Sequence, residues 1–371
     1  MKTRVGVIFG GRSGEHEISI RSARTVFEQM DKAKFEAVPM AIAPDGRWLD
    51  PAASAALLPE STRSTAFEGV ELFAAASADD FNALTLLQAS SVSGSRGIDV
   101  AFPVLHGTFG EDGTVQGLLE MAGVPYVGCG VLASACGMDK VVMKTLFEEA
   151  GLPMCRHVWF LRSDWEAGPQ GVIRDVESEL GYPCFVKPAN LGSSVGVSRA
   201  EDAASLRSAI DLAAQFDRKI IVEEALDMRE IECAVLGNAD PQASLPGEYI
   251  IRNEDKKFLD YTEKYSGTGN NEFVVPAPVS TDLSDMIRRM AVTAFAAIDG
   301  SGLARVDFFL RNDTGELLIN EINTMPGLTD ASGFPKMWAA SGRSFPDVID
   351  ELIRLALERS ADRARNRTSI A

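Results

Sequence analysis

Three oxygen-bearing side chains in the C-terminal third of the chain have the types and spacing of a divalent-metal site. Asp307 lies in a run of β-branched and aromatic residues that predicts a strand, and Glu321 and Asn323 lie in a second such run. Residues 312–315, Asn-Asp-Thr-Gly, predict a tight turn between them, so the strands should pair as a hairpin. Glu321 and Asn323 are two apart and point to one face, where Asp307 can meet them. Such oxygen ligands suit Mg²⁺ or Mn²⁺, and a solvated hairpin whose acids face water is the alternative.

The segment 187–196 has the composition of a phosphate-binding loop. Lys187 ends a predicted strand, and the glycine and serine residues after it let backbone N–H groups approach phosphate oxygens. Because the segment lacks the Gly-Lys-Ser/Thr signature that opens a helix, it is not a Walker A loop, and an ordinary flexible turn is the alternative. Lys140, early in a predicted helix, is a second candidate phosphate lysine, with a solvated side chain as its alternative.

A crossover between two predicted strands, residues 222–230, is a candidate nucleoside site. The exposed backbone of such a segment can hydrogen-bond an adenine edge, and Glu230 can accept hydrogen bonds from a ribose hydroxyl pair. A solvated acidic loop is the alternative. The later segment 252–276 is long, polar and rich in Gly and Asn, which is typical of an active-site lid. Lys264 and Tyr265 would be the lid's working residues.

Two glycine-rich loops follow predicted strands in the N-terminal part. Glu15 lies in the first, residues 10–17, where the glycine spacing is wrong for a dinucleotide-binding fingerprint. A glutamate in the first turn of a helix also repels a pyrophosphate, so Glu15 suits an ammonium partner, or is simply a first-turn acid. Both observations disfavour an NAD-linked oxidoreductase. The second loop, residues 106–113, begins with the lone His106, which is either structural or catalytic.

Composition limits the class of protein. The 371 residues exceed the usual size of one hydrophobic core, so we expect two or three domains. A net charge of −17 and a pI near 4.7 disfavour nucleic acid and anionic membranes as partners, because such surfaces would repel the chain. The five cysteines are scattered and never spaced as CxxC, which fits reduced thiols. A strand pattern from Val5 leaves no room for a signal peptide, and no apolar run could span a bilayer, so we expect a soluble cytoplasmic protein.

The hydrophobic pattern divides the chain into three predicted domains, 1–128, 129–223 and 224–371. The first alternates strands and helices, which is typical of an open α/β fold, and includes an Ala/Ser-rich elaboration at 50–96. The second holds the Gly/Ser loop, and the third holds the hairpin and the lid. Strands are predicted at residues 5–9, 35–42, 98–105, 183–187, 195–198 and 219–223, and helices at 139–150, 203–216, 283–298 and 347–357.

Taken together, six segments of the chain resemble, in the right order, the D-alanine–D-alanine ligases of the ATP-grasp superfamily. They are residues 10–17, 106–113, 138–140, 187–196, 261–265 and 305–329. The resemblance implies an α/β protein with an α+β C-terminal part, arranged as a three-domain ATP-grasp enzyme with an open α/β N-terminal domain. It also implies ATP bound between the second and third domains, two Mg²⁺ ions with Mn²⁺ as a substitute, D-alanine as substrate, and a homodimer.

The resemblance assigns roles to three groups of residues. The nucleotide group comprises Lys140, Lys187, Ser194, Val195, Glu223, Glu224, Leu226, Glu230 and Lys264, while Asp307, Glu321 and Asn323 match the metal ligands. The amino-acid group comprises Glu15, Ser193, Tyr265, Arg305, Gly327, Ser332 and Gly333. In this group Glu15 would hold the ammonium of the first D-alanine, supported by a Glu15–Ser193–Tyr265 hydrogen-bond link to the lid. Arg305 and the Gly327 N–H would stabilise an oxyanion, and Ser332 and Gly333 would receive the second carboxylate.

The implied reaction has two steps. A D-alanine carboxylate attacks the γ-phosphate of ATP to give an acyl phosphate, and the amine of a second D-alanine then attacks its carbonyl and expels phosphate. Tyr265 favours D-alanine as the second substrate, because family members that make D-alanyl-D-lactate commonly change this position. Gly333 departs from the family, where a larger apolar residue is frequent. D-alanine–D-lactate or D-alanine–D-serine ligation, and an inactive ATP-binding sensor, are the alternatives.

Overall fold

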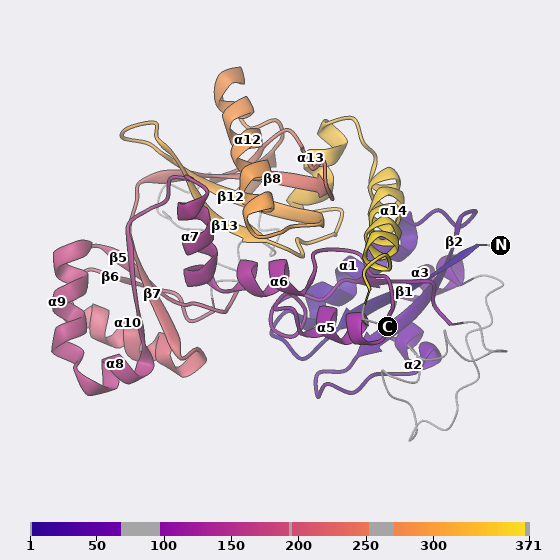
Figure 1. Cartoon of the computed structure of the whole chain (residues 1–371), viewed down its shortest axis with the longest axis horizontal. Helices are drawn as coiled ribbons and strands as arrows, with labels where there is room; N and C mark the ends of the chain where they lie inside the picture. Colours follow the sequence, from indigo (N-terminus) through magenta and orange to yellow (C-terminus); the bar gives the residue numbers. More distant parts are fainter. Residues whose placement is uncertain (1, 68–96, 193–194, 252–270, 368–371) are drawn as a thin grey trace.

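The computed structural model describes residues 2–67, 97–192, 195–251 and 271–367. Three separate β-sheets organise these residues, and helices pack against each of them (Figure 1). The predicted α/β fold with an α+β C-terminal part is confirmed. The predicted residues Ser193, Ser194, Lys264 and Tyr265 lie outside the described residues. Within the described ranges, no helix is both long enough and apolar enough to cross a membrane.

The first sheet is parallel and has the order β2-β1-β3. Seven of the eight residues of β1 are buried, as expected for the central strand of a parallel sheet. Its strands are β1 (Thr3–Gly10), β2 (Phe35–Ile42) and β3 (Val100–Pro103), and its helices are α1 (His16–Gln29), α2 (Pro51–Ala56), α3 (Glu60–Ala66) and α5 (Thr114–Met121). The three strands predicted here are confirmed. Because β1 and β3 are parallel neighbours, the two glycine-rich loops that follow them meet at one edge of the sheet.

The second sheet is antiparallel, with the order β4-β7-β5-β6. Its strands are β4 (His157–Leu161), β5 (Cys184–Pro188), β6 (Ser198–Ala200) and β7 (Lys219–Glu224), and its helices are α8 (Arg162–Ala167), α9 (Pro169–Glu179) and α10 (Ala203–Phe216). The helices pack against Cys184 and Val186 in one hydrophobic cluster. Since side chains alternate along a strand, Phe185 and Lys187 face the opposite side of the sheet, away from these helices.

The third sheet carries the predicted hairpin. Its main path is β11-β10-β8-β12-β13, with β9 paired to β8. The strands are β8 (Met228–Gly237), β9 (Gln242–Ala243), β10 (Gly247–Ile251), β11 (Asn271–Val274), β12 (Gly302–Arg311) and β13 (Leu317–Asn323). Helices α6 (Val131–Met138), α7 (Lys140–Glu149) and α12 (Thr281–Ala297) pack on one face, in a cluster with Val306 and Phe308. Alternation therefore leaves Arg305 and Asp307 on the other face.

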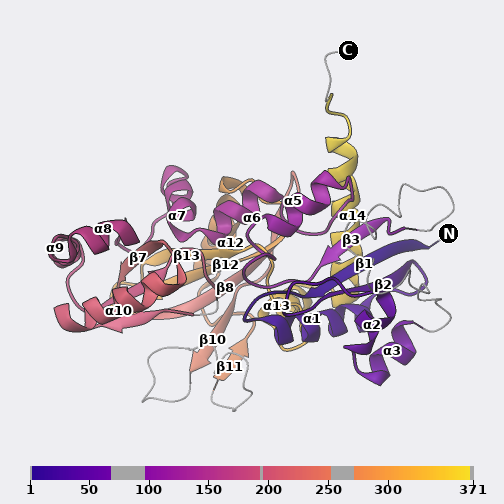
Figure 2. The ribbon, with the colours of Figure 1, turned by 90° about the horizontal axis from the view of Figure 1, so that it is seen from below.

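A hydrophobic cluster joins the first and third sheets. It includes Val7 of β1, Leu236 of β8 and Leu352 of α14 (Phe345–Arg363), together with residues of α1 and α13 (Gly333–Ala340). Figure 2 shows α14 next to β3, lying across the direction of the strands of the N-terminal sheet. Helices α6 and α7, which belong to the predicted second domain, pack on the third sheet. The domain boundaries after residues 128 and 223 stay predictions.

Candidate active site

The β12–β13 hairpin brings the three predicted metal ligands together. Asp307 lies directly opposite Glu321, and Arg305 lies opposite Asn323. The side-chain amide of Asn323 donates a 3.1 Å hydrogen bond to Asp307 Oδ2. The pairing register shifts after Asp307, so that Phe308 pairs with residue 319 and the intervening Asn320 is left over as a bulge. The three oxygen-bearing side chains are thus neighbours, as the spacing predicts.

Cationic side chains contact both carboxylates of this hairpin. Arg305 binds Asp307 through two hydrogen bonds, of 2.7 Å from Nε and 2.6 Å from Nη2, and its Nε also lies 3.4 Å from Glu232 Oε1. Lys140 Nζ lies 3.2 Å from Glu321 Oε2. Two carboxylates and an amide on adjacent strands are a donor set that fits a hard divalent cation, and the surrounding cations can turn toward phosphate when such an ion binds.

A pocket between the second and third sheets gathers most of the predicted nucleotide residues. Predicted residues that line it are Lys140, Lys187, Glu223, Glu224, Leu226, Glu230, Asp307 and Glu321. Leu191, Gly192 and Met228 also line it and lie within the predicted segments 187–196 and 222–230, whereas Phe185, Phe309 and Asn320 were not assigned a role from the sequence. The apolar members provide a surface on which a flat base can lie. Adjacent residues Asn320 and Glu321 both line the pocket because the bulge interrupts the alternation of β13.

Lys140 is held at the start of α7 by both sides of the pocket. Its backbone N–H donates to the Ala189 carbonyl and its Nζ donates to the Leu191 carbonyl, each over 3.0 Å. Asp139 caps the helix by accepting hydrogen bonds from the N–H groups of residues 141 and 142, and it also pairs with Lys219. Because Lys140 also contacts Glu321, the candidate phosphate lysine and the predicted metal ligands lie in one site.

Two lysines share the buried carboxylate of Glu223. Lys187 Nζ lies 2.5 Å from Glu223 Oε2, and Lys144 Nζ lies 2.9 Å from Oε1. Burial alone would raise the pKa of Glu223, but the two lysines hold it well below its usual range. Burial would lower the pKa of Lys187, but Glu223 raises it above its ordinary value. Sequence analysis missed Lys144, whose one signal is its place one helical turn after Lys140.

The other nucleotide residues have different surroundings. Glu224 accepts three hydrogen bonds from Arg156, from its backbone N–H at 2.8 Å and from Nε and Nη2 at 3.0 and 2.8 Å. Its side chain is therefore committed to Arg156, and its backbone N–H also donates to the Arg156 carbonyl over 3.1 Å. Val195 is exposed and does not line the pocket, although its N–H bonds the Gly192 carbonyl at 3.3 Å.

The loops after β1 and β3 bring acidic groups together in the N-terminal sheet. A Cβ on Gly107 would lie 2.9 Å from Glu15 Oε2, and the φ of +75° at this position is one that glycine adopts without strain. Glu111 accepts a 2.7 Å hydrogen bond from the Gly107 N–H. Burial and the charge of Glu15 raise the pKa of Glu111 to about 8. This edge of the sheet can therefore hold an ammonium group beside Glu15.

His106 connects the N-terminal sheet to the third sheet. Its Nδ1 lies 3.0 Å from the Met325 carbonyl, and its Nε2 lies 3.2 Å from Ser22 Oγ. The Nδ1–H must donate to the carbonyl, so Nε2 accepts from the serine. Burial lowers the pKa of His106, which keeps the ring neutral. These contacts support a structural role for His106, which joins the N-terminal sheet to the segment after β13.

A second pocket, between α1 and residues 327–333, contains the predicted second-substrate residues. Arg305, Gly327, Ser332 and Gly333 line it, together with α1 residues that sequence analysis missed, among them Ile18, Arg21 and Thr25. A Cβ on Gly327 would lie 2.8 Å from Ser332 Oγ, so glycine allows the close approach of the serine. Ser332 Oγ also accepts a hydrogen bond from the Thr329 N–H over 3.2 Å. Arg305 is common to this pocket and the metal hairpin.

The departure at Gly333 has a physical reason in this chain. A Cβ at this position would lie 2.6 Å from Glu232 Oε2 and 2.8 Å from the ring of Phe273. Glu232 and Phe273 therefore occupy the space into which a larger residue would project. The second-substrate pocket is shaped here by side chains of the third sheet.

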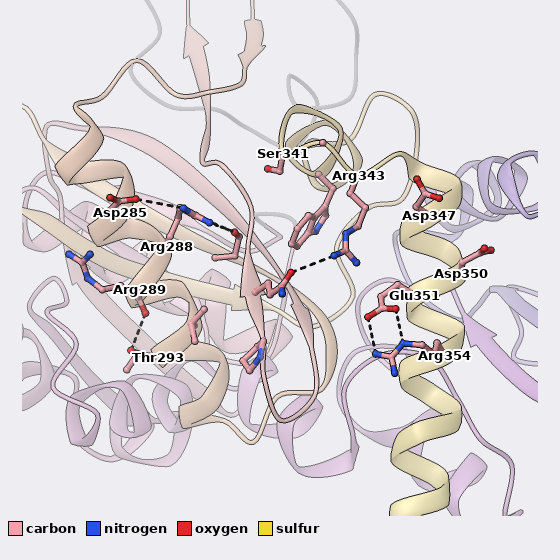
Figure 3. A pocket seen from close by; sticks show the side chains of 16 residues that line it. Asp285, Arg288, Arg289, Thr293, Ser341, Arg343, Asp347, Asp350, Glu351 and Arg354 are labelled. Atoms are coloured by element: carbon pink, nitrogen blue, oxygen red, sulfur yellow. Dashed lines mark hydrogen bonds and ion pairs between the residues drawn. The ribbon is translucent and has the colours of Figure 1, made fainter.

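A third, wider pocket lies between α12 and α14 and contains none of the predicted residues (Figure 3). Two of its arginines are hydrogen-bonded to neighbouring protein groups. Arg288 donates to the Ala243 carbonyl at 3.1 Å, and Arg354 donates to both oxygens of Glu351 at 2.7 and 2.9 Å. Since acidic side chains also line it, including Asp285 and Asp347, it is a weaker candidate for phosphate binding than the pocket between the sheets.

Two family models match consecutive parts of the chain. Residues 4–129 match the D-ala D-ala ligase N-terminus, and residues 146–354 match the D-ala D-ala ligase C-terminus. A D-alanine–D-alanine ligase from Acetivibrio thermocellus is 48% identical, and the match covers 97% of each chain. Another from Geobacillus thermodenitrificans is 46% identical, with 98% of each chain covered.

Solved structures resemble the chain over the same length. The D-alanine–D-alanine ligase from Coxiella burnetii has a TM-score of 0.78 and 34% identity, covering 98% of both chains. A D-Ala:D-Ser ligase from Enterococcus faecalis has a TM-score of 0.78 and 35% identity, covering 96% of this chain and 100% of that one. With both family models matched along nearly its whole length, the chain belongs to the D-alanine–D-alanine ligase family.

Proposed function

We propose that the chain catalyses the ATP-dependent ligation of two D-alanine molecules to D-alanyl-D-alanine, for peptidoglycan precursor synthesis. The contact of 3.2 Å between Lys140 Nζ and Glu321 Oε2 carries the proposal, because it brings a phosphate-type cation against a metal-type carboxylate. Family membership and relatives at 46–48% identity support the same activity. ATP and a divalent metal are the cofactors that this family uses.

The charges around the first pocket suit phosphoryl transfer to a carboxylate. Two anions, the D-alanine carboxylate and the γ-phosphate, must approach each other in the first step. Lys140, Lys187 and Arg305 lie where they can offset this repulsion. Asp307, Glu321 and Asn323 would hold the metal, which we propose to be two Mg²⁺ ions replaceable by Mn²⁺. When bound, the metal supplies further neutralisation of phosphate charge.

The second pocket and, separately, the edge of the N-terminal sheet that carries Glu15 suit the amino acids. We infer that Glu15 holds the ammonium of the first D-alanine, and that Ser332 and the Gly333 region receive the carboxylate of the second. Arg305 and the Gly327 N–H would then stabilise the oxyanion that forms when the second amine attacks the acyl phosphate. Arg305 lines the second pocket and contacts Asp307 of the metal hairpin, so one guanidinium can serve both steps.

The remaining roles follow from the family resemblance. We propose that Ser194, Val195 and Lys264 contribute to ATP binding, and that Ser193 and Tyr265 form the link from Glu15 to the lid. Residues 1–128, 129–223 and 224–371 would act as three domains. We also propose a cytoplasmic homodimer. The five cysteines are free thiols, which supports a reducing compartment, and light scattering at about twice 39.9 kDa would support the dimer.

Phosphate release and dipeptide formation test the activity. The purified chain is given ATP and Mg²⁺ with D-alanine alone, and we expect release of one phosphate per D-alanyl-D-alanine formed. Absence of release with D-alanine alone would contradict the proposal. Bound ATP without any dipeptide would instead support an inactive sensor.

Parallel reactions with D-serine or D-lactate added separate the alternative ligases. The similarity to a D-Ala:D-Ser ligase and the small Gly333 make this comparison necessary. We expect D-alanyl-D-alanine to remain the main product. A predominant mixed product at equal concentrations of the two second substrates would favour the alternative.

A further inference from the structure

Lys144 is a buried lysine on α7 to which the proposed mechanism gives no role. Its side chain is 1% exposed, and its Nζ lies 2.9 Å from Glu223 Oε1 and 3.7 Å from Cys155 Sγ. The other oxygen of Glu223 lies 2.5 Å from Lys187 Nζ. One buried carboxylate is therefore shared by two ammonium groups, one on each oxygen.

The three side chains carry an excess of one positive charge. Burial would raise the pKa of Glu223, but both lysines lower it, so the carboxylate stays ionised at neutral pH. Burial would lower the pKa of Lys144, but Glu223 raises it above its ordinary value, so the ammonium stays protonated. With Lys144 replaced by a neutral residue, Glu223 and Lys187 would form a neutral pair.

Position separates Lys144 from the residues that can touch a nucleotide. Lys187 and Glu223 line the pocket between the sheets, whereas Lys144 does not. It approaches Glu223 from α7, whose other residues Met143 and Phe147 pack on the third sheet. Any influence of Lys144 on a ligand must therefore act through Glu223 and through its own charge.

We propose that Lys144 is a positioning residue for ATP binding, which holds one oxygen of Glu223 and thereby leaves Lys187 with a net positive field for the phosphates. The proposal rests on the assignment of this pocket to ATP. A lysine buried only for packing would be a costly choice, because an apolar side chain of similar length avoids the loss of hydration. An electrostatic effect on the phosphates would explain why a lysine is kept here despite its lost hydration.

The test measures the affinities of ATP and adenosine for the full chain by calorimetry, without D-alanine. Adenosine carries the base and ribose but no phosphate. For Lys144→Met we expect ATP to bind on the order of tenfold more weakly or worse, because a unit charge next to the Glu223–Lys187 pair is lost, while adenosine, which carries no phosphate, is affected much less. Lys336→Met, which removes an exposed lysine from α13, is the control for overall charge and should leave both affinities at wild-type values.

A second variant gives the proposal a sharper test. Lys144→Met combined with Glu223→Gln restores the excess positive charge, so the ratio of ATP to adenosine affinity should return toward the wild-type value. If Lys144→Met does not fold, which circular dichroism would reveal, the double variant and Lys144→Arg carry the test, and both should keep the wild-type ratio.

Three results would overturn the role of Lys144. They are equal weakening of ATP and adenosine in Lys144→Met, unchanged ATP binding in that variant, or a double variant with the same low ratio as the single one. Failure of the wild-type chain to bind ATP is a different result, because it would overturn the proposed function itself.

Discussion

Asp307 faces Glu321 across the β12–β13 pairing, immediately before a bulge that turns Asn320 into the same pocket as Glu321. This relationship concentrates oxygen donors at one point of an otherwise regular hairpin. Arg305 and Lys140 contact the two carboxylates, so their negative charges are offset. If the hairpin binds a metal as proposed, Lys140 and Arg305 would have to release these carboxylates and could then turn toward phosphate.

Replacement of the carboxylate at Glu321 tests this arrangement. We expect Glu321→Gln to lower the rate of phosphate release at saturating ATP by on the order of a hundredfold or more, because it removes a metal ligand and the partner of Lys140. The melting temperature should change little, since the side chain is partly exposed at the pocket. Phosphate release and thermal unfolding measure the two effects.

The same hairpin offers a control for Glu321. Glu316 lies in the turn, where its Oε2 is 4.0 Å from Arg311, and its side chain is exposed. Glu316→Gln should keep wild-type turnover. Near wild-type turnover in Glu321→Gln would refute the metal assignment.

Crowding at Gly333 predicts the effect of a larger residue there. Gly333→Ala would place a Cβ 2.6 Å from Glu232 and 2.8 Å from Phe273. We expect a loss of about 1–3 kcal/mol of unfolding free energy, as in other overpacked cores, and a higher KM for the second D-alanine. Combination with Phe273→Ala should recover part of the KM effect. Gly117→Ala is the control, because a Cβ there meets nothing within 4 Å.

Denaturant unfolding and initial rates at varied D-alanine concentration measure these effects. A KM for the second D-alanine that stays at the wild-type value in Gly333→Ala would argue against the placement of this subsite. Equal destabilisation by Gly117→Ala would show that the contacts of a Cβ at position 333 with Glu232 and Phe273 do not cause the loss of stability.

The helix cap at Asp139 predicts a linked loss of stability and ATP affinity. Asp139→Ala removes the acceptor for two N–H groups of α7 and the partner of Lys219, so we expect a loss of about 1–2 kcal/mol. The KM for ATP should rise, because α7 begins with Lys140. Burial would raise the pKa of Asp139, but Lys219 and the helix N–H groups lower it below its ordinary value. Its contribution to stability is therefore present at neutral pH and is lost in acid as the carboxylate protonates.

Another capped helix separates these two effects. Asp202 caps α10 by accepting a 2.8 Å hydrogen bond from the Ser205 N–H, and it does not line the pocket between the sheets. Asp202→Ala should destabilise the fold to a similar extent and leave the KM for ATP unchanged. Equal changes of KM in both variants would indicate that the effect of Asp139 on ATP is only a consequence of lower stability.

Site residues could be predicted from the sequence where their contacts are local along the chain, and not where the contacts join distant segments. Asp307, Glu321 and Asn323 were predictable, because strand alternation and a short turn fix their relation locally. Lys144 was not, because its partner Glu223 lies on β7, far from α7 in the sequence, and a lysine in a helix is usually solvated. Asn320 was missed for a different reason, since a bulge breaks the alternation from which pocket-facing positions are inferred.

The same distinction between local patterns and long-range contacts applies to the fold. The strands at residues 5–9, 35–42, 183–187 and 219–223 and the helix at 139–150 were predicted close to their observed bounds. The strand predicted at 195–198 begins only at Ser198, and β4, β9, β10 and β11 were not predicted. The packing of α14 beside the N-terminal sheet depends on contacts between the two ends of the chain. No local pattern specifies such contacts.

The buried carboxyl of Glu111 predicts how stability depends on pH. Burial and Glu15 raise its pKa to about 8, whereas its ordinary value is 4.5. As the pH rises between these values, the unfolded chain releases the proton and the folded chain keeps it, so Glu111 makes stability fall with rising pH over this window. Glu111→Gln cannot titrate, and its stability relative to wild type should therefore increase from pH 5 to pH 8.

Thermal unfolding at pH 5, 6.5 and 8 measures this difference. Glu17→Gln, which changes an exposed acid in the first turn of α1, is the control and should follow the wild-type profile at all three pH values. Parallel profiles for wild type and Glu111→Gln would mean that Glu111 is ionised in the folded chain at neutral pH. In that case the 2.7 Å hydrogen bond from the Gly107 N–H would outweigh both burial and the repulsion by Glu15, because a backbone donor favours the charged form of a carboxyl group.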